Sequence, residues 1–262
     1  MNTYTDPLDF VSRRDEVKSA IEEQFKKNVR GRIPDLTEYN AKHDGAEGDW
    51  LTKEMGLTVN GKNEPDYLGF EMKKQSIGKT TFGDWSPDVS IWQGINSTFN
   101  RDHFLSIFGS PNPLKGNRYS WSGRVFPKIG RVNDYGQSLE ISKIQDVRAI
   151  YSHSQNRVLE SRNLIPLPLQ VEGLELAKWT HPRLKSRLER KFNQLGWFRC
   201  LKDNTGAYAK LQFGLPISIE TFMPLFKAGV IYIDCGMHQN NPRPYMTFRA
   251  SNAIWNKLAE KN

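Results

Sequence analysis

The segment of residues 64–74, which reads EPDYLGFEMKK, contains acidic side chains and a lysine whose spacing suits metal-assisted chemistry. If residues 67–75 form a β-strand, side chains alternate between its faces, so Glu71 and Lys73 point to the same side. Asp66 precedes Glu71 across a glycine that permits a bend. Two carboxylates near one lysine can hold Mg²⁺, which can activate water and stabilise charge on a phosphoryl oxygen. The lysine can orient the attacking water, so the segment carries the groups that phosphodiester hydrolysis requires.

The Glu-x-Lys spacing is a weak signal by itself. It arises by chance about once in a chain of this length, given ordinary residue usage. A second copy, Glu16-Val17-Lys18, lies in a predicted helix on a solvated face. The Pro-Asp pair upstream and the apolar alternation make the copy in residues 64–74 more specific. An ordinary strand with charged side chains remains the alternative to a nuclease centre.

Basic residues exceed acidic residues and are clustered along the chain. The 262 residues include 37 Lys and Arg against 29 Asp and Glu, which gives a formal net charge of +8. Residues 178–199 carry seven Lys and Arg against one acid, and residues 101–135 carry six against two, interleaved with aromatic side chains. Such clusters favour a nucleic acid partner, because basic side chains displace counterions from phosphates. General solubility is the alternative explanation of the net charge.

The apolar pattern predicts a mixture of helices and strands around the acidic segment. Helices are predicted to begin at residues 6, 47, 181 and 218, the first with an aspartate cap followed by proline. Strands are predicted at residues 67–75, within 86–108, at 139–151, at 230–235 and at 245–250. Residues 111–136 are rich in Gly, Asn and Pro and predict long loops. This order predicts an α/β (α+β) fold with a mixed sheet flanked by helices.

Several other classes of protein do not fit the chain. No apolar run approaches the roughly 20 residues that span a bilayer, and the first residues lack the basic and apolar regions of a secretory signal. Two cysteines cannot form a disulfide framework or a cysteine-rich zinc site, and the five histidines show no paired metal spacing. A reducing, cytoplasmic location is therefore expected.

Longer motifs around the acidic segment resemble the MvaI/BcnI-type type II restriction endonucleases, in the MutH-like branch of the PD-(D/E)xK nucleases. A Gly-x-x-Gly helix at residues 45–51 and a Met-Gly-Leu turn at 55–57 precede the Asp…Glu-x-Lys strand. The resemblance continues, in the order that the family uses, at residues 105–111, in the loop that follows to 136, and at 211–213, 222–234 and 247–249. It covers about half of the chain and leaves residues 140–205 unmatched.

The resemblance implies a sheet flanked by helices in two lobes that form a cleft around duplex DNA. Residues 1–140 would form mainly the catalytic lobe and residues 141–262 mainly the DNA-recognition lobe, or the two lobes would interleave. The metal ligands would be Asp66, Glu71 and the backbone carbonyl of Met72, and Lys73 would be the catalytic lysine.

The activity implied is Mg²⁺-dependent hydrolysis of duplex DNA at a short specific site of the CC…GG type, leaving 5′-phosphates. A monomer would nick one strand and then the other, and a cognate DNA methyltransferase would protect the host without contacting this chain. Two alternatives remain. One is a MutH-like repair endonuclease that nicks a single strand, and the other is a sequence-specific DNA-binding protein on a catalytically decayed nuclease fold.

Candidate DNA-contact residues fall in two segments. The family reads bases with a strand-loop-strand, which here spans residues 232–249. Asp234 would accept from a cytosine amino group, while Arg243 or Arg249 would bind guanine O6 and N7, with His238 as a further candidate. The basic and aromatic loop within residues 111–136 supplies the other candidates, which are Lys115, Arg118, Trp121 and Arg124.

The sequence departs from the family pattern in two places. Thr52 stands where relatives usually carry a helix glutamate that reaches the site. Glu47 and Glu54 are nearby, but helix geometry directs both elsewhere. The family's His-Asp-x-Gly base-reading loop is replaced by Asn-Asn-Pro-Arg-Pro at residues 240–244, so a different sequence specificity is expected.

Overall fold

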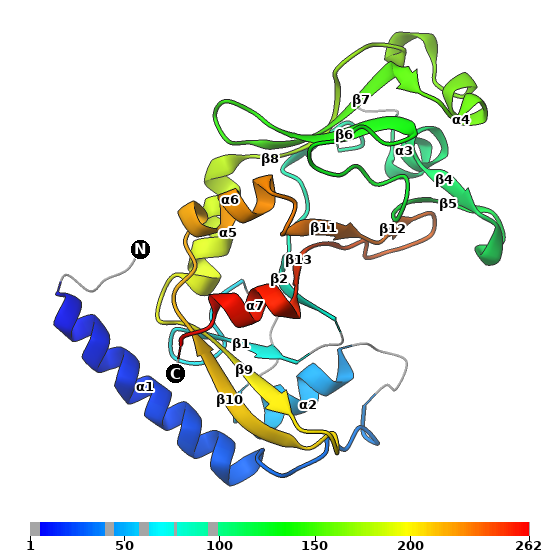
Figure 1. Ribbon diagram of the computed structural model, residues 1–262. Coiled ribbons are helices and arrows are strands. Elements are labelled where there is room, and N and C mark those ends of the chain that lie inside the picture. The colour runs from blue at the N-terminus through cyan, green and yellow to red at the C-terminus, as the bar shows by residue number, and fades with distance from the viewer. Residues whose placement is uncertain (1–5, 40–44, 58–62, 76–77, 94–98, 262) are drawn as a thin grey trace. The chain divides into compact units, whose positions relative to one another are not determined.

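The chain divides into two units, each of which combines segments that are far apart in the sequence. The computed structural model describes residues 6–39, 45–57, 63–75, 78–93 and 99–261 (Figure 1). Unit 1 consists of Met1–Thr80, Arg187–Ile219 and Ser251–Asn262, and unit 2 consists of Thr81–Ser186 and Glu220–Ala250. Helices and strands are mixed along the chain, so the α+β class expected from the sequence is confirmed.

Unit 1 is built on a three-stranded sheet in the order β1-β9-β10. β1 (Phe70–Lys74) pairs in parallel with β9 (Gly196–Lys202), and β10 (Tyr208–Gly214) pairs antiparallel with β9. The helices of this unit are α1 (Pro7–Asn28), α2 (Ala46–Glu54), the end of α5 (His181–Phe192) and α7 (Asn252–Leu258). In the described part of the chain β1 is an edge strand, with β9 as its one neighbour.

The helix α1 begins where the sequence predicts. The Asp6 side chain accepts a hydrogen bond of 2.8 Å from the Leu8 amide, and a proline occupies the first helical position. Both features favour a helix start, because they satisfy or remove amide donors that lack intrahelical partners. The buried side chains of α1 recur every three or four residues and are Arg14, Val17, Ile21 and Phe25.

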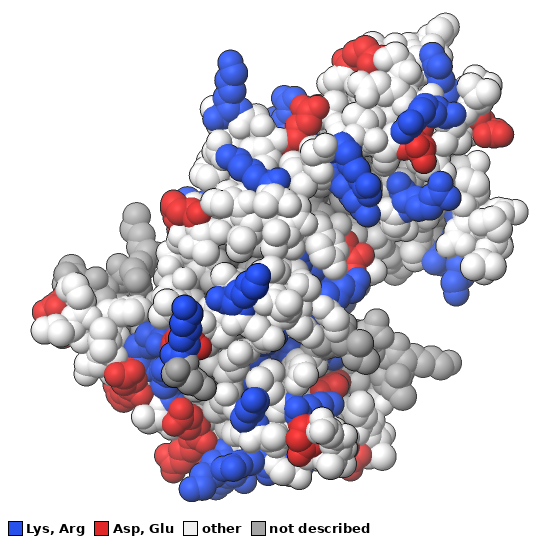
Figure 2. Space-filling model, in the orientation of Figure 1, with Lys and Arg blue, Asp and Glu red and all other residues white. Residues whose placement is uncertain are grey.

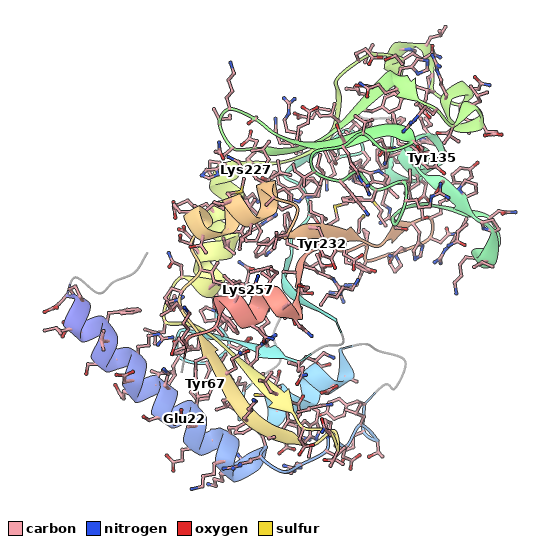
Figure 3. The ribbon with its side chains drawn as sticks, viewed as in Figure 1. Glu22, Tyr67, Tyr135, Lys227, Tyr232 and Lys257 are labelled. Atoms are coloured by element: carbon pink, nitrogen blue, oxygen red, sulfur yellow. The ribbon has the colours of Figure 1, made fainter. Side chains whose placement is uncertain are left out.

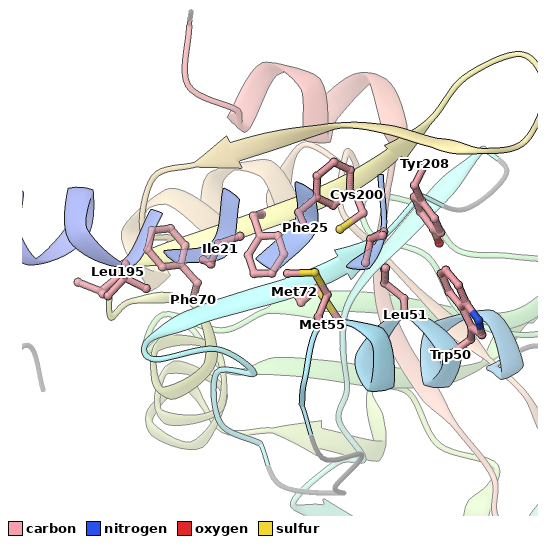
Figure 4. Close-up of a cluster of buried hydrophobic side chains, with 13 residues drawn as sticks. Ile21, Phe25, Trp50, Leu51, Met55, Phe70, Met72, Leu195, Cys200 and Tyr208 are labelled. Carbon is pink, nitrogen blue, oxygen red and sulfur yellow. The ribbon is translucent and has the colours of Figure 1, made fainter. Parts of the chain in front are cut away.

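One face of β1 packs in the hydrophobic core of unit 1. Phe70 and Met72 join a cluster of buried side chains from α1, α2, β9, β10 and their flanking residues, which includes Ile21, Phe25, Trp50, Leu51, Met55, Leu195, Phe198, Cys200 and Tyr208 (Figure 4). Burial of one large apolar side chain contributes about 1.5–3 kcal/mol. The core therefore fixes which face of β1 is apolar and directs Glu71 and Lys73 to the other face.

The strands of unit 2 form three sheets in the described residues. The largest has the order β3-β8-β7-β6 and contains β3 (Val89–Ser90), β6 (Tyr135–Ile141), β7 (Val147–Asn156) and β8 (Leu174–Trp179). The order β11-β13-β2 combines β11 (Tyr232–Cys235), β13 (Met246–Ser251) and β2 (Lys79–Asp84). The order β12-β5-β4 combines β12 (Met237–His238), β5 (Arg118–Trp121) and β4 (Ser110–Asn112).

The remaining helices are α3 (Arg101–Phe108), α4 (Leu159–Asn163) and α6 (Ile219–Lys227), with short 3-10 turns at Pro113–Lys115 and Leu167–Leu169. Within the described part of residues 86–108, the expected strand is limited to β3, and residues 101–108 form α3, which Asn100 caps through a 3.0 Å bond from the His103 amide. The loops expected at residues 111–136 contain β5, which pairs with β4 and β12. Among the helices described, none has the length and apolar character needed to span a bilayer.

Candidate active site

A tight turn brings Asp66 back against the strand that follows it. Leu68 and Gly69 have φ angles of +44° and +102°, and the Asp66 carboxylate accepts a 2.9 Å hydrogen bond from the Met72 amide. Positive φ is readily adopted by glycine, which explains the glycine at this point of the turn. Tyr67, labelled in Figure 3, closes the turn by exchanging backbone hydrogen bonds with the first residue of β1. The aspartate of the motif is thereby held beside the Glu-x-Lys strand.

Glu71 and Lys73 lie on the same face of β1 and bind each other. The Lys73 Nζ lies 2.6 Å from Glu71 Oε1, and the two side chains are 13% and 2% exposed. Burial raises the pKa of Glu71 to about 7, against the opposing effect of Lys73, and the neighbouring charge of Asp66 raises it further. Burial likewise lowers the pKa of Lys73. Three of the residues predicted from the sequence are therefore brought together in one electrostatically coupled cluster.

A second lysine, which the sequence analysis missed, belongs to the same cluster. Lys191 in the last turn of α5 places its Nζ 3.1 Å from Glu71 Oε1, the oxygen that also binds Lys73. A signal for it exists in the sequence, because Lys191 follows Leu184 by seven residues and Leu188 by three, and both leucines are buried. A lysine in line with the apolar positions of an amphipathic helix requires a buried partner.

The helix α2 offers no glutamate to this cluster. At the position where a helix glutamate was expected, Thr52 donates a 2.8 Å hydrogen bond to the Gly48 carbonyl. Glu47 accepts from the Tyr208 hydroxyl at 2.6 Å and pairs with Lys202 at 2.7 Å. Glu54 pairs with an arginine of the segment after α1. The expectation that both glutamates point elsewhere is confirmed.

In unit 2, one small sheet unites the two candidate DNA-contact segments. β12 pairs with β5, so that His238 lies opposite Ser120, and the Gln239 amide bonds to the Tyr119 carbonyl at 3.0 Å. The sheet thus carries His238 and Arg118 on neighbouring strands, and the exposed Lys115 lies in the turn between β4 and β5. Arg118 and His238 come from positions about 120 residues apart in the chain.

The loop at residues 240–244 is braced by hydrogen bonds of the Asn241 side chain. The Asn241 side chain donates a 3.0 Å hydrogen bond to the Gly236 carbonyl and accepts one of 3.0 Å from the Arg243 amide. Asn240 supplies the turn with a φ of +61°, which asparagine tolerates better than most residues. Arg243 is exposed on this braced loop.

Asp234 and Arg249 do not stand apart as two independent base-reading groups. They lie on the paired strands β11 and β13. β11 begins at Tyr232, and β13 follows the loop of residues 240–244 (Figure 3). The Arg249 Nε lies 3.2 Å from an Asp234 carboxylate oxygen, and both side chains are half-buried. A base that bound to either side chain would therefore meet a preformed ion pair.

Arg124 and Trp121 are close in sequence, but the first side chain is exposed and the second is buried. Arg124 is exposed and lies 3.8 Å from Asp134. Trp121 is fully buried, and its indole N–H donates to the Gln137 side chain at 2.7 Å. The prediction that Trp121 contacts DNA is therefore wrong. Its aromatic ring packs against Trp92, Phe104 and Phe126 instead.

The basic side chains do not merge into one band on the face drawn in Figure 2. Among the residues coloured there, Lys and Arg are spread over the surface with Asp and Glu between them. Net charge alone therefore does not mark a binding surface on that face, and the candidate DNA contacts rest on position rather than on charge density.

The matches to known proteins decide the family. A model of the LlaMI restriction endonuclease family matches residues 29–262. The type II restriction enzyme ScrFI of Lactococcus lactis subsp. cremoris is 40% identical over 261 residues, which covers 92% of this chain and 96% of ScrFI. The chain belongs to the LlaMI restriction endonuclease family. Membership of this family assigns type II restriction endonuclease activity on DNA, and it confirms the resemblance drawn from the motifs.

The fold of this LlaMI-family protein is also found in a solved relative. The complex of the restriction endonuclease MvaI with its cognate DNA substrate matches with a TM-score of 0.56 at 13% identity, over 94% of this chain and 96% of MvaI. At that identity the match supports the shared α+β fold rather than any residue's role.

The acidic cluster of the LlaMI-family protein suits a hard divalent cation. Glu71 Oε2 is buried and has no hydrogen-bond partner in the described residues. Nowhere in those residues do three or more His, Cys, Asp or Glu side chains gather as a metal site. One or two carboxylates are what Mg²⁺ commonly takes from a protein, because water and substrate phosphate complete its octahedron. Asp66 and Glu71 therefore fit Mg²⁺ better than they fit zinc, which prefers nitrogen and sulfur ligands.

A cation held by Glu71 should bind more weakly as the pH drops below about 7. The Glu71 pKa of about 7 means that a proton occupies the carboxylate at lower pH and competes with the cation, whereas above pH 7 the group is ionised. Titration calorimetry of the DNA-free protein with Mn²⁺ should give an affinity about tenfold weaker at pH 6 than at pH 8. Equal affinities at the two pH values would show that Glu71 is not a ligand or that it ionises at its ordinary pKa.

Proposed function

We propose that this protein is a Mg²⁺-dependent endonuclease that hydrolyses phosphodiester bonds at a short specific site in duplex DNA and leaves 5′-phosphates. The observation that carries the proposal is the cluster formed by Asp66, Glu71 and Lys73 on and beside β1, where two carboxylates and a lysine converge. Family membership supplies the restriction activity, and the cluster supplies residues that can perform it.

In this proposal Asp66, Glu71 and the carbonyl of Met72 hold Mg²⁺, which supplies Lewis-acid stabilisation of charge on the phosphate and lowers the pKa of water. The turn at Leu68 and the hydrogen bond from the Met72 amide keep Asp66 oriented toward β1. Lys73 donates hydrogen bonds from Nζ to the attacking water or to the phosphate oxygen, which orients the water and offsets the negative charge that develops during attack. Burial of the lysine strengthens this interaction because water screens it less.

Sequence reading is assigned to residues of unit 2. Asp234, His238, Arg243 and Arg249 are proposed to contact base edges, and Lys115, Arg118 and Arg124 to contact phosphates. Support comes from the pairing of β12 with β5 and from the braced loop that carries Arg243. Catalysis is assigned to unit 1, where the acidic cluster lies. We further propose that the protein acts as a cytoplasmic monomer beside a cognate DNA methyltransferase.

Replacement of Arg243 by alanine should weaken specific DNA binding more than non-specific binding. A bidentate arginine–guanine contact contributes about 1–3 kcal/mol of discrimination, so the Kd for the cognate duplex should rise about tenfold or more. Fluorescence anisotropy with Ca²⁺ in place of Mg²⁺ measures both values without cleavage. Replacement of Arg124, which is proposed to meet phosphate, should instead weaken both kinds of binding and reduce the salt dependence. Equal effects of the two changes would remove Arg243 from the base-reading set.

Cleavage of an unmethylated plasmid tests the proposal directly. Purified protein with Mg²⁺ should produce discrete double-stranded fragments from supercoiled DNA. The fragment ends should be ligatable without a kinase step, since ligation requires 5′-phosphates. A product that stops at the nicked circle would favour a MutH-like repair nickase instead. DNA that is shifted but never cut with Mg²⁺ or Mn²⁺ would favour a decayed nuclease, and sequencing of genomic fragment ends would define the recognition site.

A further inference from the structure

We propose that Lys191 is a positioning residue of the nuclease centre, which holds the Glu71 carboxylate in place beside Lys73 while Lys73 directs a donor toward the reacting phosphate. The inference rests on the proposed function of Asp66, Glu71 and Lys73. Lys191 acts through Glu71 and is not itself placed at the reacting atoms.

The different surroundings of the two Glu71 carboxylate oxygens support this role. Both ammonium groups bind Oε1, with Lys73 Nζ at 2.6 Å and Lys191 Nζ at 3.1 Å. Oε2 is buried and has no hydrogen-bond partner in the described residues. The two lysines thus fix the carboxylate by one oxygen and leave the other oxygen to be offered to a cation.

The end of α5 places Lys191 at the cluster. Its side chain is 17% exposed, although lysine is ordinarily a surface residue. The next residue, Phe192, is fully buried, and the Lys73 Nζ lies 5.2 Å from the centre of its ring. The last turn of α5 therefore contacts both partners of the Glu71–Lys73 pair. A long side chain with this little exposure is held in place by packing as well as by charge.

The charges in the cluster explain why a second lysine is needed. The cluster combines two carboxyl groups, Asp66 and Glu71, with two lysines, Lys73 and Lys191. The Lys73 ammonium has three N–H donors, so it can bond Glu71 and still direct a donor toward water or phosphate. If Lys73 were the only cation on Glu71, any shift of Lys73 toward the substrate would weaken the one partner of a buried carboxylate, which is costly. With Lys191 on the same oxygen, the carboxylate keeps a second partner during that shift.

The first test is single-turnover cleavage of a cognate duplex by the Lys191→Met protein. Methionine keeps an unbranched side chain and removes the charge. The rate constant should fall about 10- to 100-fold, as for other residues that orient a catalytic carboxylate. The Kd for DNA, measured with Ca²⁺, should stay within about twofold, because the role is not DNA binding. Lys191→Arg should restore much of the rate. The control is Lys27→Met, which removes an exposed lysine from the last turn of α1 and should leave the rate unchanged.

The second test needs no cleavage and measures the partnership with Glu71. Lys191→Met should lower the Tm by about 3 °C in the natural sequence, since a buried carboxylate loses a partner. In a Glu71→Gln background the same change should lower the Tm by less than about 1 °C, because the Glu71 carboxylate that Lys191 neutralises is absent. Equal losses in the two backgrounds would overturn the partnership.

The outcomes separate this inference from the proposed function. A Lys191→Met protein that cleaves at the natural rate, or that loses DNA affinity in proportion to its rate, overturns the positioning role of Lys191. If Lys73→Ala cleaves normally, the proposed function fails, and the positioning of Lys73 fails with it. The thermal cycle then still reports whether Lys191 and Glu71 are partners in the folded protein.

Discussion

Replacing Lys73 with alanine should abolish cleavage while DNA binding persists. The change removes the ammonium 2.6 Å from Glu71 and with it the donor proposed to stabilise charge at the phosphate. Loss of one preorganised donor of this kind costs about 10²–10³-fold in rate, and the buried setting places the expectation at the upper end. Single-turnover cleavage of a labelled duplex measures the rate, and anisotropy with Ca²⁺ measures the affinity, which should stay within about threefold.

The chain supplies a matched control for this experiment. Lys18 is the lysine of the second Glu-x-Lys spacing, but it lies in α1, where it pairs with Glu260 at 2.8 Å. Lys18→Ala should therefore leave the cleavage rate within about twofold, apart from a small loss of stability. Retained cleavage by Lys73→Ala would move the active site to other residues.

Replacing Arg14 with methionine should destabilise the protein strongly without touching the acidic cluster. Arg14 is 7% exposed, and its guanidinium donates to the Leu195 carbonyl at 2.8 Å and to the Gly214 carbonyl at 3.0 Å. It also pairs with Glu260 near the C-terminus. Removing Arg14 leaves the two carbonyls without their donor, at a cost of about 1–3 kcal/mol for each buried group, while Glu260 keeps Lys18 as a partner. The Tm should fall by roughly 10 °C in a thermal melt.

The neighbouring arginine is the control for the stability experiment. Arg13 pairs with Glu16 at 2.8 Å on the surface of α1, where both side chains are at least one third exposed. Exposed pairs of this kind contribute at most about 1 kcal/mol. Arg13→Met should therefore shift the Tm by no more than about 3 °C. Similar shifts for both variants would mean that the buried contacts of Arg14 do not hold α1 to the sheet.

The parts of the fold that depend on local pattern could be predicted from the sequence. The aspartate cap and proline of α1 and the alternation along β1 act within a few residues, so their consequences are visible in the chain itself. The same-side placement of Glu71 and Lys73 follows from strand geometry alone. The position of Asp66 beside β1 also requires positive φ angles in the turn before the strand, and the glycine at position 69 indicated such a turn.

The parts that depend on tertiary packing could not be predicted in the same way. Lys191 reaches Glu71 only because α5 ends against β1, and the two residues are separated by 120 positions. Trp121 was a candidate DNA contact because arginines flank it in sequence, but in the fold its ring packs in the core against Trp92, Phe104 and Phe126. The helix α3 was missed because its aromatic and branched residues also suit a strand, and the Asn100 cap decided the outcome.

Because β1 pairs with β9, the strand that carries the acidic motif gains its neighbour only late in synthesis of the chain. Residues 70–74 leave the ribosome early, but their partners at residues 196–200 follow more than a hundred residues later. Until then the two carboxylates and Lys73 lie on a strand with no neighbour to hold it, and an isolated strand has little stability in water. A nascent or prematurely terminated chain that stops before β9 thus contains the whole acidic motif without the scaffold that shapes it. Activity from the proposed centre therefore requires a chain that extends through β9.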